Sequence, residues 1–444
     1  MNLTNETIQK ISKGEYAFDF LKITLTQKKA EQPKIYSGSG SVTYDKNGEL
    51  ILKMYHLFSD DQEALKELND DFSRNIEPGQ LISNEYYYEM CAIDVIGNTW
   101  TSDFLSLSAD ISIPSNGKVI TSKVRSIQLS SDEASSNSNF KLALFSNTKI
   151  KFPKNARDET LSYTNFNKCV VEKSDFELSI KKVDDELMLI NATLKNKHAN
   201  EISANLLTEA LCILFGRYIQ SLVKIENDNG KQIITVFSPS DKTDNKSVIS
   251  PIPTRVPADT KNIAEFVDSY MNYFNESISP FFGYWFRILD ATNSHIENQG
   301  LIVTTSIEGV LKNYFNSSGK PDMEILKDAE QAGPIIKLLK ISERLKARLL
   351  ASLGNLKGFT AKNALHNLKD KKKVTKEMMD AWSKLRNKCA HADQLKNDEG
   401  KLQDFLDQNY ACLGLFYMLL FIKLNYRGAY TDLSCKGWPE KVIA

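Results

Sequence analysis

The sequence has no paired cysteines and no long apolar run, and these absences exclude several classes of protein. Its six cysteines are scattered, without Cys-x-x-Cys or the Cys/His spacing of a zinc site, so they predict buried free thiols in a reducing compartment. The longest apolar run, Ala411 to Ile422, has twelve residues, whereas a membrane span needs about 20. The first residues contain no apolar segment typical of a signal peptide. We therefore expect a cytoplasmic protein that does not enter a membrane.

The glycine-rich loops of common nucleotide-binding folds are also absent. The stretch Gly38-Ser39-Gly40-Ser41 has no third glycine and leads into a predicted strand instead of a helix. Gly230-Lys231 and Gly319-Lys320 lack the upstream glycine and the following Ser or Thr of a P-loop. No cluster of acidic side chains suggests a metal site. We expect neither a cofactor nor a metal ion.

The chain has no net charge, but its charges are unevenly spread. Its 444 residues are 41% hydrophobic and 25% charged, which is typical of a globular protein of two or three domains. Residues 337–388 contain fifteen Lys or Arg against four Asp or Glu, a local balance of +11. Such a segment suits the binding of a polyanion, but a solvated helical face has the same composition. Both interpretations stay open.

The first part of the chain, from about residue 15 to 195, is predicted to be mostly β-structure. Asn47-Gly48 and Gly97-Asn98 each separate two β-rich segments, a strong local signal for a hairpin whose turn requires positive φ. A series of short strands with polar turns then follows. This spacing suggests a sandwich or a barrel-like domain.

A middle segment, residues 196–258, is predicted to be a helix followed by a linker. Glu201 to Ile225 has helical periodicity, and Gln232 to Phe237 is a short expected strand. Four prolines then lie between Ser238 and Pro257 among polar residues, a composition typical of linkers. We therefore expect three parts: a β-rich domain over residues 1–195, this connecting segment, and a helical domain over residues 259–444.

The last part of the chain has the periodicity of an antiparallel helical bundle. The expected helices run over residues 259–273, 281–289, 300–315, 322–353, 375–391 and 401–424, with a break at Pro334 in the fourth. The final helix is apolar nearly all round from Ala411 onward, which predicts a buried position. The expected fold class is α+β, with a β-rich N-terminal domain followed by an all-α bundle.

One stretch of the bundle, Ala381 to Asp393, carries groups that suit RNA cleavage. On its helix, one apolar stripe consists of Met378, Trp382, Leu385 and Cys389 and is expected to face the core. The other faces of the helix then present their polar residues to solvent near its C-terminal end. Those residues are Arg386, Asn387 and His391. A guanidinium can bind the extra negative charge of a pentacoordinate phosphate, and an imidazole can take or give a proton. The alternative is that His391 only ends the helix as a surface residue.

A single histidine does not easily serve as base and acid on opposite sides of an in-line displacement. Two copies of the motif facing each other across a two-fold axis would supply both groups, so we expect a homodimer. The reaction needs no metal ion. Lys371, Lys372, Lys373 and Lys388 are candidate contacts to the RNA backbone, although a loop of lysines is commonly just solvated.

These residues resemble the Arg-polar-x-x-x-His motif of the HEPN superfamily (higher eukaryotes and prokaryotes nucleotide-binding domains). The tail beyond the last helix, with Gly428-Ala429-Tyr430 and Gly437-Trp438-Pro439, is similar to that of Apea-like HEPN proteins. The helix Leu301 to Phe315 is similar to their Glu-bearing helix, with Glu308 either an accessory residue of the site or a buried acid satisfied by a neighbouring helix. The resemblance covers about residues 260–440.

The resemblance implies a metal-independent endoribonuclease of anti-phage defence, a toxin of abortive infection that cleaves tRNA or mRNA as a dimer. Carried over, Arg386 would stabilise the phosphate, His391 would transfer protons and Asn387 would orient His391 or the phosphate. The β-rich domain would be a sensor or an autoinhibitory domain, with a phage-derived trigger. The rival hypotheses are a non-catalytic HEPN module that binds RNA, a nucleotide or a partner protein, and a purely structural dimerisation bundle.

Overall fold

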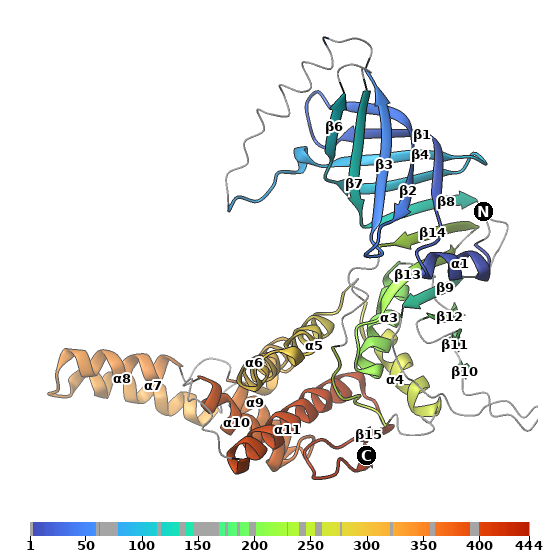
Figure 1. Ribbon diagram of the computed structural model, residues 1–444. Helices are drawn as coiled ribbons and strands as arrows, with labels where there is room; N and C mark the ends of the chain where they lie inside the picture. Colours follow the sequence, from blue (N-terminus) through green and yellow to red (C-terminus); the bar gives the residue numbers. More distant parts are fainter. Residues whose placement is uncertain are drawn as a thin grey trace, which may run out of the picture. The chain divides into compact units, whose positions relative to one another are not determined.

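The computed structural model describes most of the chain and divides it into two compact units (Figure 1). The described residues are 3–58, 62, 79–112, 117–132, 138–145, 168–173, 176–183, 187–194, 201–228, 230–238, 246–253, 260–275, 278–319, 323–355, 360–390 and 399–443. Unit 1 comprises Met1–Ala204 and Ile219–Asn245, and unit 2 comprises Asn205–Tyr218 and Lys246–Ala444. The chain is therefore of the mixed α+β class, with an antiparallel sheet in unit 1 and helices in unit 2.

Unit 1 is built on one antiparallel sheet of fourteen strands within the described residues. Helix α1 (Asn5–Ser12) precedes it. The strands are β1 (Phe18–Gln27), β2 (Ile35–Tyr44), β3 (Leu50–Leu57), β4 (Tyr88–Asp94), β5 (Thr99–Leu105), β6 (Ser108–Ser112), β7 (Gly117–Val124), β8 (Ser126–Asp132), β9 (Asn139–Phe145), β10 (Lys168–Glu172), β11 (Phe176–Lys182), β12 (Leu187–Leu194), β13 (Gln220–Asp228) and β14 (Lys231–Phe237). Their order across the sheet is β10-β11-β12-β9-β13-β14-β8-β5-β4-β1-β2-β3-β7-β6.

The strands form a single sheet that curls over itself, and of the two predicted alternatives, a sandwich and a barrel-like domain, this agrees with the barrel-like one. In Figure 1, β3 and β7 cross in front of β1 and β4, and inward residues of these four strands share one core cluster with α1. Strand residues alternate between buried and exposed, as in β4, where every second side chain is buried. A single continuous ladder of hydrogen bonds therefore encloses the core.

Both predicted hairpins are confirmed, but each turn has positive φ at one glycine only. The β2–β3 turn places Gly48 at φ +82°, and the β4–β5 turn places Gly97 at φ +88°. In the first turn the Asp45 carboxylate accepts hydrogen bonds from two backbone N–H groups, and Asp94 does the same in the second. An Asp three residues before the Gly thus sets the turn by an Asx-type bond.

The predicted helix Glu201–Ile225 is wrong beyond its first fifteen residues. Helix α3 (Glu201–Phe215) ends where Gly216 takes φ +64° and the Arg217 N–H bonds back to the Cys212 carbonyl. This is a Schellman-type end, which glycine adopts without strain. The next residues form β13, which pairs with β9 and β14 in the middle of the sheet. The predicted connecting segment 196–258 is therefore divided between the two units.

The described part of the proline-rich segment, residues 246–253, is packed and not a free linker. The Val248 N–H donates to the Gly216 carbonyl, and the Tyr417 hydroxyl donates to the Ile249 carbonyl. Ile252 is buried. These contacts lie within unit 2.

Unit 2 is a helical bundle ending in a two-stranded ribbon. Besides α3 its helices are α4 (Thr260–Tyr273), α5 (Pro280–Asp290), α6 (Ile296–Tyr314), α7 (Met323–Leu338), α8 (Glu343–Asn355), α9 (Ala361–Asp370), α10 (Lys376–Ala390) and α11 (Glu399–Leu424), and the ribbon is β15 (Ala429–Thr431) with β16 (Glu440–Val442). The predicted buried position of the last helix is confirmed, because α11 packs against α4, α6 and α10. Helix α11 is also long and apolar enough to cross a membrane. However, 72% of its 18-residue apolar window is buried inside the protein.

Two predictions in the basic region differ from the structure. Helix α7 continues through Pro334, and the break comes at residues 339–342 instead. Pro334 lies inside this helix as an exposed residue. Helix α9 was not predicted, since its ten residues are polar except for a short buried stripe of Ala364, Leu365 and Leu368.

Candidate functional site

The motif helix α10 is held in the bundle by the predicted apolar stripe. Thr375 precedes the helix, and its hydroxyl accepts a hydrogen bond from the Met378 N–H, as an N-cap does. Met378, Trp382 and Leu385 are buried, which confirms the stripe, while Cys389 is only half-buried. The opposite side of α10 is therefore free to carry polar groups.

A glycine on α6 lets α10 approach closely. A Cβ at Gly300 would lie 2.9 Å from the Cys389 Sγ and 3.1 Å from a methyl of Leu385, so a larger residue would force the helices apart. Further along, the Trp382 indole N–H donates to the Thr304 carbonyl at 3.3 Å. The two helices are thus fixed in register next to the motif.

Arg386 contacts Glu308 across this helix pair. The Arg386 Nε donates to the Glu308 Oε1, and the two side chains are 48% and 34% exposed. Glu308 has the neighbouring-helix partner that the sequence suggested, but it is not buried. A guanidinium has five N–H donors, and no described residue accepts from the terminal amino groups of Arg386. Among the described residues, those two groups are therefore left for a ligand to use.

The three predicted catalytic residues are only partly described. Arg386 and Asn387 are adjacent, exposed residues of α10. His391 follows the last residue of that helix, Ala390, and lies outside the described residues. The structure brings Arg386 and Asn387 into one cleft and adds Glu308 to them.

This motif cleft has a volume of about 700 Å³ and is formed by α6, α9 and α10. Its lining residues are Thr305, Glu308, Gly309, Lys312, Thr360, Ala361, Lys362, Trp382, Ser383, Arg386 and Asn387. Three cationic side chains and one carboxylate thus share the cleft with hydroxyl groups. Such a surface can bind an anion at its Arg and Lys side chains while the carboxylate orients the Arg.

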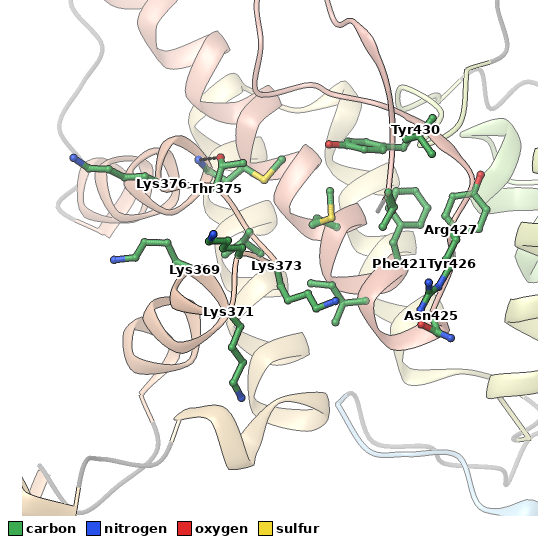
Figure 2. A pocket seen from close by; sticks show the side chains of 17 residues that line it. Lys369, Lys371, Lys373, Thr375, Lys376, Phe421, Asn425, Tyr426, Arg427 and Tyr430 are labelled. Carbon is green, nitrogen blue, oxygen red and sulfur yellow. Dashed lines mark hydrogen bonds between the residues drawn. The ribbon is translucent and has the colours of Figure 1, made fainter.

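A second cleft lies at the other end of α10 (Figure 2). We call it the lysine cleft, and it encloses about 490 Å³. Its cations are Lys369, Lys371, Lys372, Lys373, Lys376 and Arg427, and its lining contains no acidic residue. In Figure 2 the labelled lysines lie on one side, and Phe421, Tyr426, Arg427 and Tyr430 lie across from them. The structure thus brings the predicted lysines together with Arg427, which sequence spacing did not reveal.

The cations of the lysine cleft are largely unpaired. Lys369 contacts its neighbour Asp370 at 3.2 Å. Among the described residues, no carboxylate lies within ion-pair distance of the other five cations. No carboxylate of the described residues therefore relieves the mutual repulsion of these charges, and a bound anion would relieve it.

Two helices end at the lysine cleft with strained residues. Lys372 follows α9 at φ +55°, and Asn425 follows α11 at φ +52°. In both cases the next residue bonds back to the last turn, Lys373 to Leu368 and Tyr426 to Phe421. Glycine is the usual residue at such a position, and a non-glycine residue costs about 1 kcal/mol or more. A lysine therefore occupies the position after α9 at some cost in stability.

Lys388 does not join either group. Its Nζ lies 2.8 Å from the Asp404 Oδ2 on α11, and this contact lowers the pKa of Asp404. Lys388 lines neither the motif cleft nor the lysine cleft. Its predicted role in RNA binding stays a prediction, with a structural partner beside it.

A buried polar cluster lies elsewhere in unit 2 and was not predicted. The Tyr270 hydroxyl donates to the Glu209 Oε2 at 2.8 Å, and the Ser279 N–H donates to the same carboxylate at 3.2 Å. Burial raises the pKa of Glu209 to about 7, although these hydrogen bonds oppose the rise. The cluster joins α3, α4 and the N-terminus of α5.

Within the described ranges, no three His, Cys, Asp or Glu side chains are grouped as metal ligands would be. Comparisons of the chain with protein-family models, with curated proteins and with solved structures find no match. The assignment to the HEPN superfamily therefore stays a prediction that depends on the motif and on the geometry around it.

Proposed function

We propose that this protein is a metal-independent endoribonuclease of the HEPN type, which cleaves tRNA or mRNA as a homodimer in phage defence by abortive infection. The observation that carries the proposal is the setting of Arg386. Its side chain is held by Glu308 through Nε, its terminal amino groups have no acceptor among the described residues, and Asn387 lines the same cleft. Unit 1 would be the sensor of a phage-derived trigger.

The proposed reaction is the transfer of a phosphodiester to the neighbouring 2′-oxygen. A base takes the 2′ proton, the 2′-oxygen forms a bond to phosphorus, and the bond from phosphorus to the 5′-oxygen breaks. An acid gives a proton to that 5′-oxygen. The products are a 2′,3′-cyclic phosphate and a free 5′-hydroxyl. Arg386 would stabilise the charge on phosphorus, and His391 of each of two copies would serve as base or acid.

The lysine cleft would hold the RNA away from the reacting phosphate. Lys376 and Arg386 lie ten residues apart on α10, which corresponds to about 15 Å along the helix. Cations at both ends of one helix suit a ligand with several phosphates better than a single small anion. This arrangement favours RNA as the substrate class.

An alternative function is a non-catalytic module that binds RNA, a nucleotide or a partner protein. The lysine cleft favours it, because five of its cations have no carboxylate partner among the described residues and can bind an anion without chemistry. A purely structural bundle is the third hypothesis. RNA in which every 2′-hydroxyl is methylated separates binding from cleavage, because the proposed nuclease should bind this RNA but not cut it. Cutting of such RNA would contradict the proposed mechanism.

Replacing both Lys371 and Lys373 with alanine is expected to weaken binding of that uncleavable RNA in a salt-dependent manner. Two lost phosphate contacts should reduce the magnitude of the slope of log K against log salt by about 1.4. The affinity is measured by fluorescence anisotropy between 50 and 200 mM salt.

The matched control for this pair is Lys22→Ala with Lys46→Ala, which removes two exposed lysines of unit 1. The control should bind as the wild type does. Equal slopes for all three proteins would show that the lysine cleft does not contact RNA.

A further inference from the structure

Helices α7 and α8 form a hairpin that packs on itself (Figure 1). Ala329 is the one buried residue of α7, and none of the described side chains of α8 is buried. A helix of a globular protein normally buries one apolar face against its neighbours. Within the part of the chain that the structure describes, both helices of this hairpin therefore leave most of their apolar side chains uncovered.

The uncovered surface of the hairpin is rich in aliphatic side chains. Seven are exposed by between 36% and 84%, namely Met323, Ile325, Ile335, Leu338, Leu339, Leu345 and Leu349. Five of them flank the turn between the helices, and the other two lie at the start of α7. Burial of such side chains contributes about 25 cal/mol per Å², so seven of them exposed on one hairpin indicate an interaction surface.

The charges of the hairpin are separated along its length. At the base, the start of α7 carries three acids and one lysine, with Glu324 and Asp328 one turn apart on either side of Ile325. At the tip, residues 337–348 carry five cations and the single acid Glu343. Arg344 and Arg348 are one turn apart and flank Leu345 in the same way. The hairpin thus has a negative base and a positive tip.

We infer that the hairpin pairs with the same hairpin of a second copy of this chain. With a two-fold axis perpendicular to the hairpins they run antiparallel, so each positive tip meets the negative base of its partner. The aliphatic side chains of each tip then pack against Met323 and Ile325 of the other base. A partner protein would have to reproduce both ends of this pattern, whereas a second copy supplies both by symmetry.

The surface would join two copies of the chain, as the proposed homodimer requires, and to that extent this inference rests on the proposed function. The exposure and the charge of the hairpin support pairing independently of RNA cleavage. Mass in solution tests it without RNA, so the two proposals can fail separately. A dimer that pairs through the hairpin but does not cleave RNA would contradict the nuclease alone. RNA cleavage by a dimer that does not need the hairpin would contradict this inference alone.

Light scattering after gel filtration is the test, at about 50 µM full-length protein. The wild type should have the mass of a dimer. Two variants reverse one end each: Glu324→Lys with Asp328→Lys makes the base positive, and Arg344→Glu with Arg348→Glu makes the tip negative. Each should raise the dimer dissociation constant at least about 100-fold, because like charges then meet. Circular dichroism and thermal melting verify that both variants fold.

An equimolar mixture of the two variants should recover the dimer mass, because each base then meets a tip of opposite charge. This recovery is expected only if copies of the chain pair through the hairpin. The control Lys22→Glu with Lys46→Glu makes the same charge change in unit 1 and should remain dimeric. A monomeric wild type, variants that stay fully dimeric, or a mixture that stays monomeric would each overturn the inference.

Discussion

Replacing Arg386 with alanine is expected to lower the rate of RNA cleavage by about 10²- to 10³-fold. That loss is typical when one preorganised donor to a developing oxyanion is removed. The thermal midpoint should change little, because the pair with Glu308 is half-exposed and such pairs contribute about 1 kcal/mol or less. Single-turnover cleavage of an end-labelled RNA measures the effect, and the fall should appear in the rate at saturating protein.

Two further variants show whether the guanidinium itself matters. Arg386→Lys keeps the charge but loses the planar pair of donors, so its rate should lie between those of the wild type and the alanine variant. Lys384→Ala removes an exposed cation from the same helix, outside both clefts, and should cleave normally. An Arg386→Ala rate within twofold of the wild type would remove Arg386 from the site.

Glu209→Gln is expected to flatten the dependence of stability on pH. The folded-state pKa of Glu209 is about 7, against a usual 4.5, because the carboxyl is buried. Between these two pKa values the carboxyl is ionised in the unfolded state but still protonated in the folded state. The wild type therefore loses stability as pH rises from 4.5 to about 7, and Glu209 causes no further loss at higher pH. The full difference corresponds to about 3 kcal/mol. A glutamine stays neutral and can keep the bonds to Tyr270 and Ser279.

Chemical denaturation at pH 5 and pH 8 measures this effect as a change in the free energy of unfolding. The wild type should lose about 2 to 3 kcal/mol more than Glu209→Gln over that interval. Glu343→Gln, at a side chain that is 86% exposed, should follow the wild type. If Glu209→Gln also follows the wild type, the carboxyl is not the group that titrates.

The sequence predicted those parts of the fold that depend on local pattern. The stripe of Met378, Trp382 and Leu385 specified the buried side of α10, and the apolar run from Ala411 specified the buried helix α11. Each signal lies within one element, where side-chain period and burial agree. The two hairpins were found for the same reason, through a turn residue between two β-rich segments.

The parts that the sequence did not reveal depend on partners far along the chain. Tyr218 and Leu222 continue the helical period of α3, yet Gly216 ends the helix and the following segment pairs with β9. The contact between Arg386 and Glu308 spans 78 residues, and Arg427 reaches the lysine cleft only through the path of the tail after α11. Periodicity carries no information about such pairs, because they are set by tertiary packing.

Cleavage of end-labelled tRNA and of a long mRNA in the presence of EDTA, by the wild type and by His391→Ala, tests the central claim most directly. Our account predicts cleavage by the wild type alone, with 2′,3′-cyclic phosphate or 3′-phosphate ends, while both proteins bind the RNA equally well. Equal cleavage by the two proteins would contradict the assignment of the site. Binding without cleavage by either protein would favour the non-catalytic module in place of the nuclease.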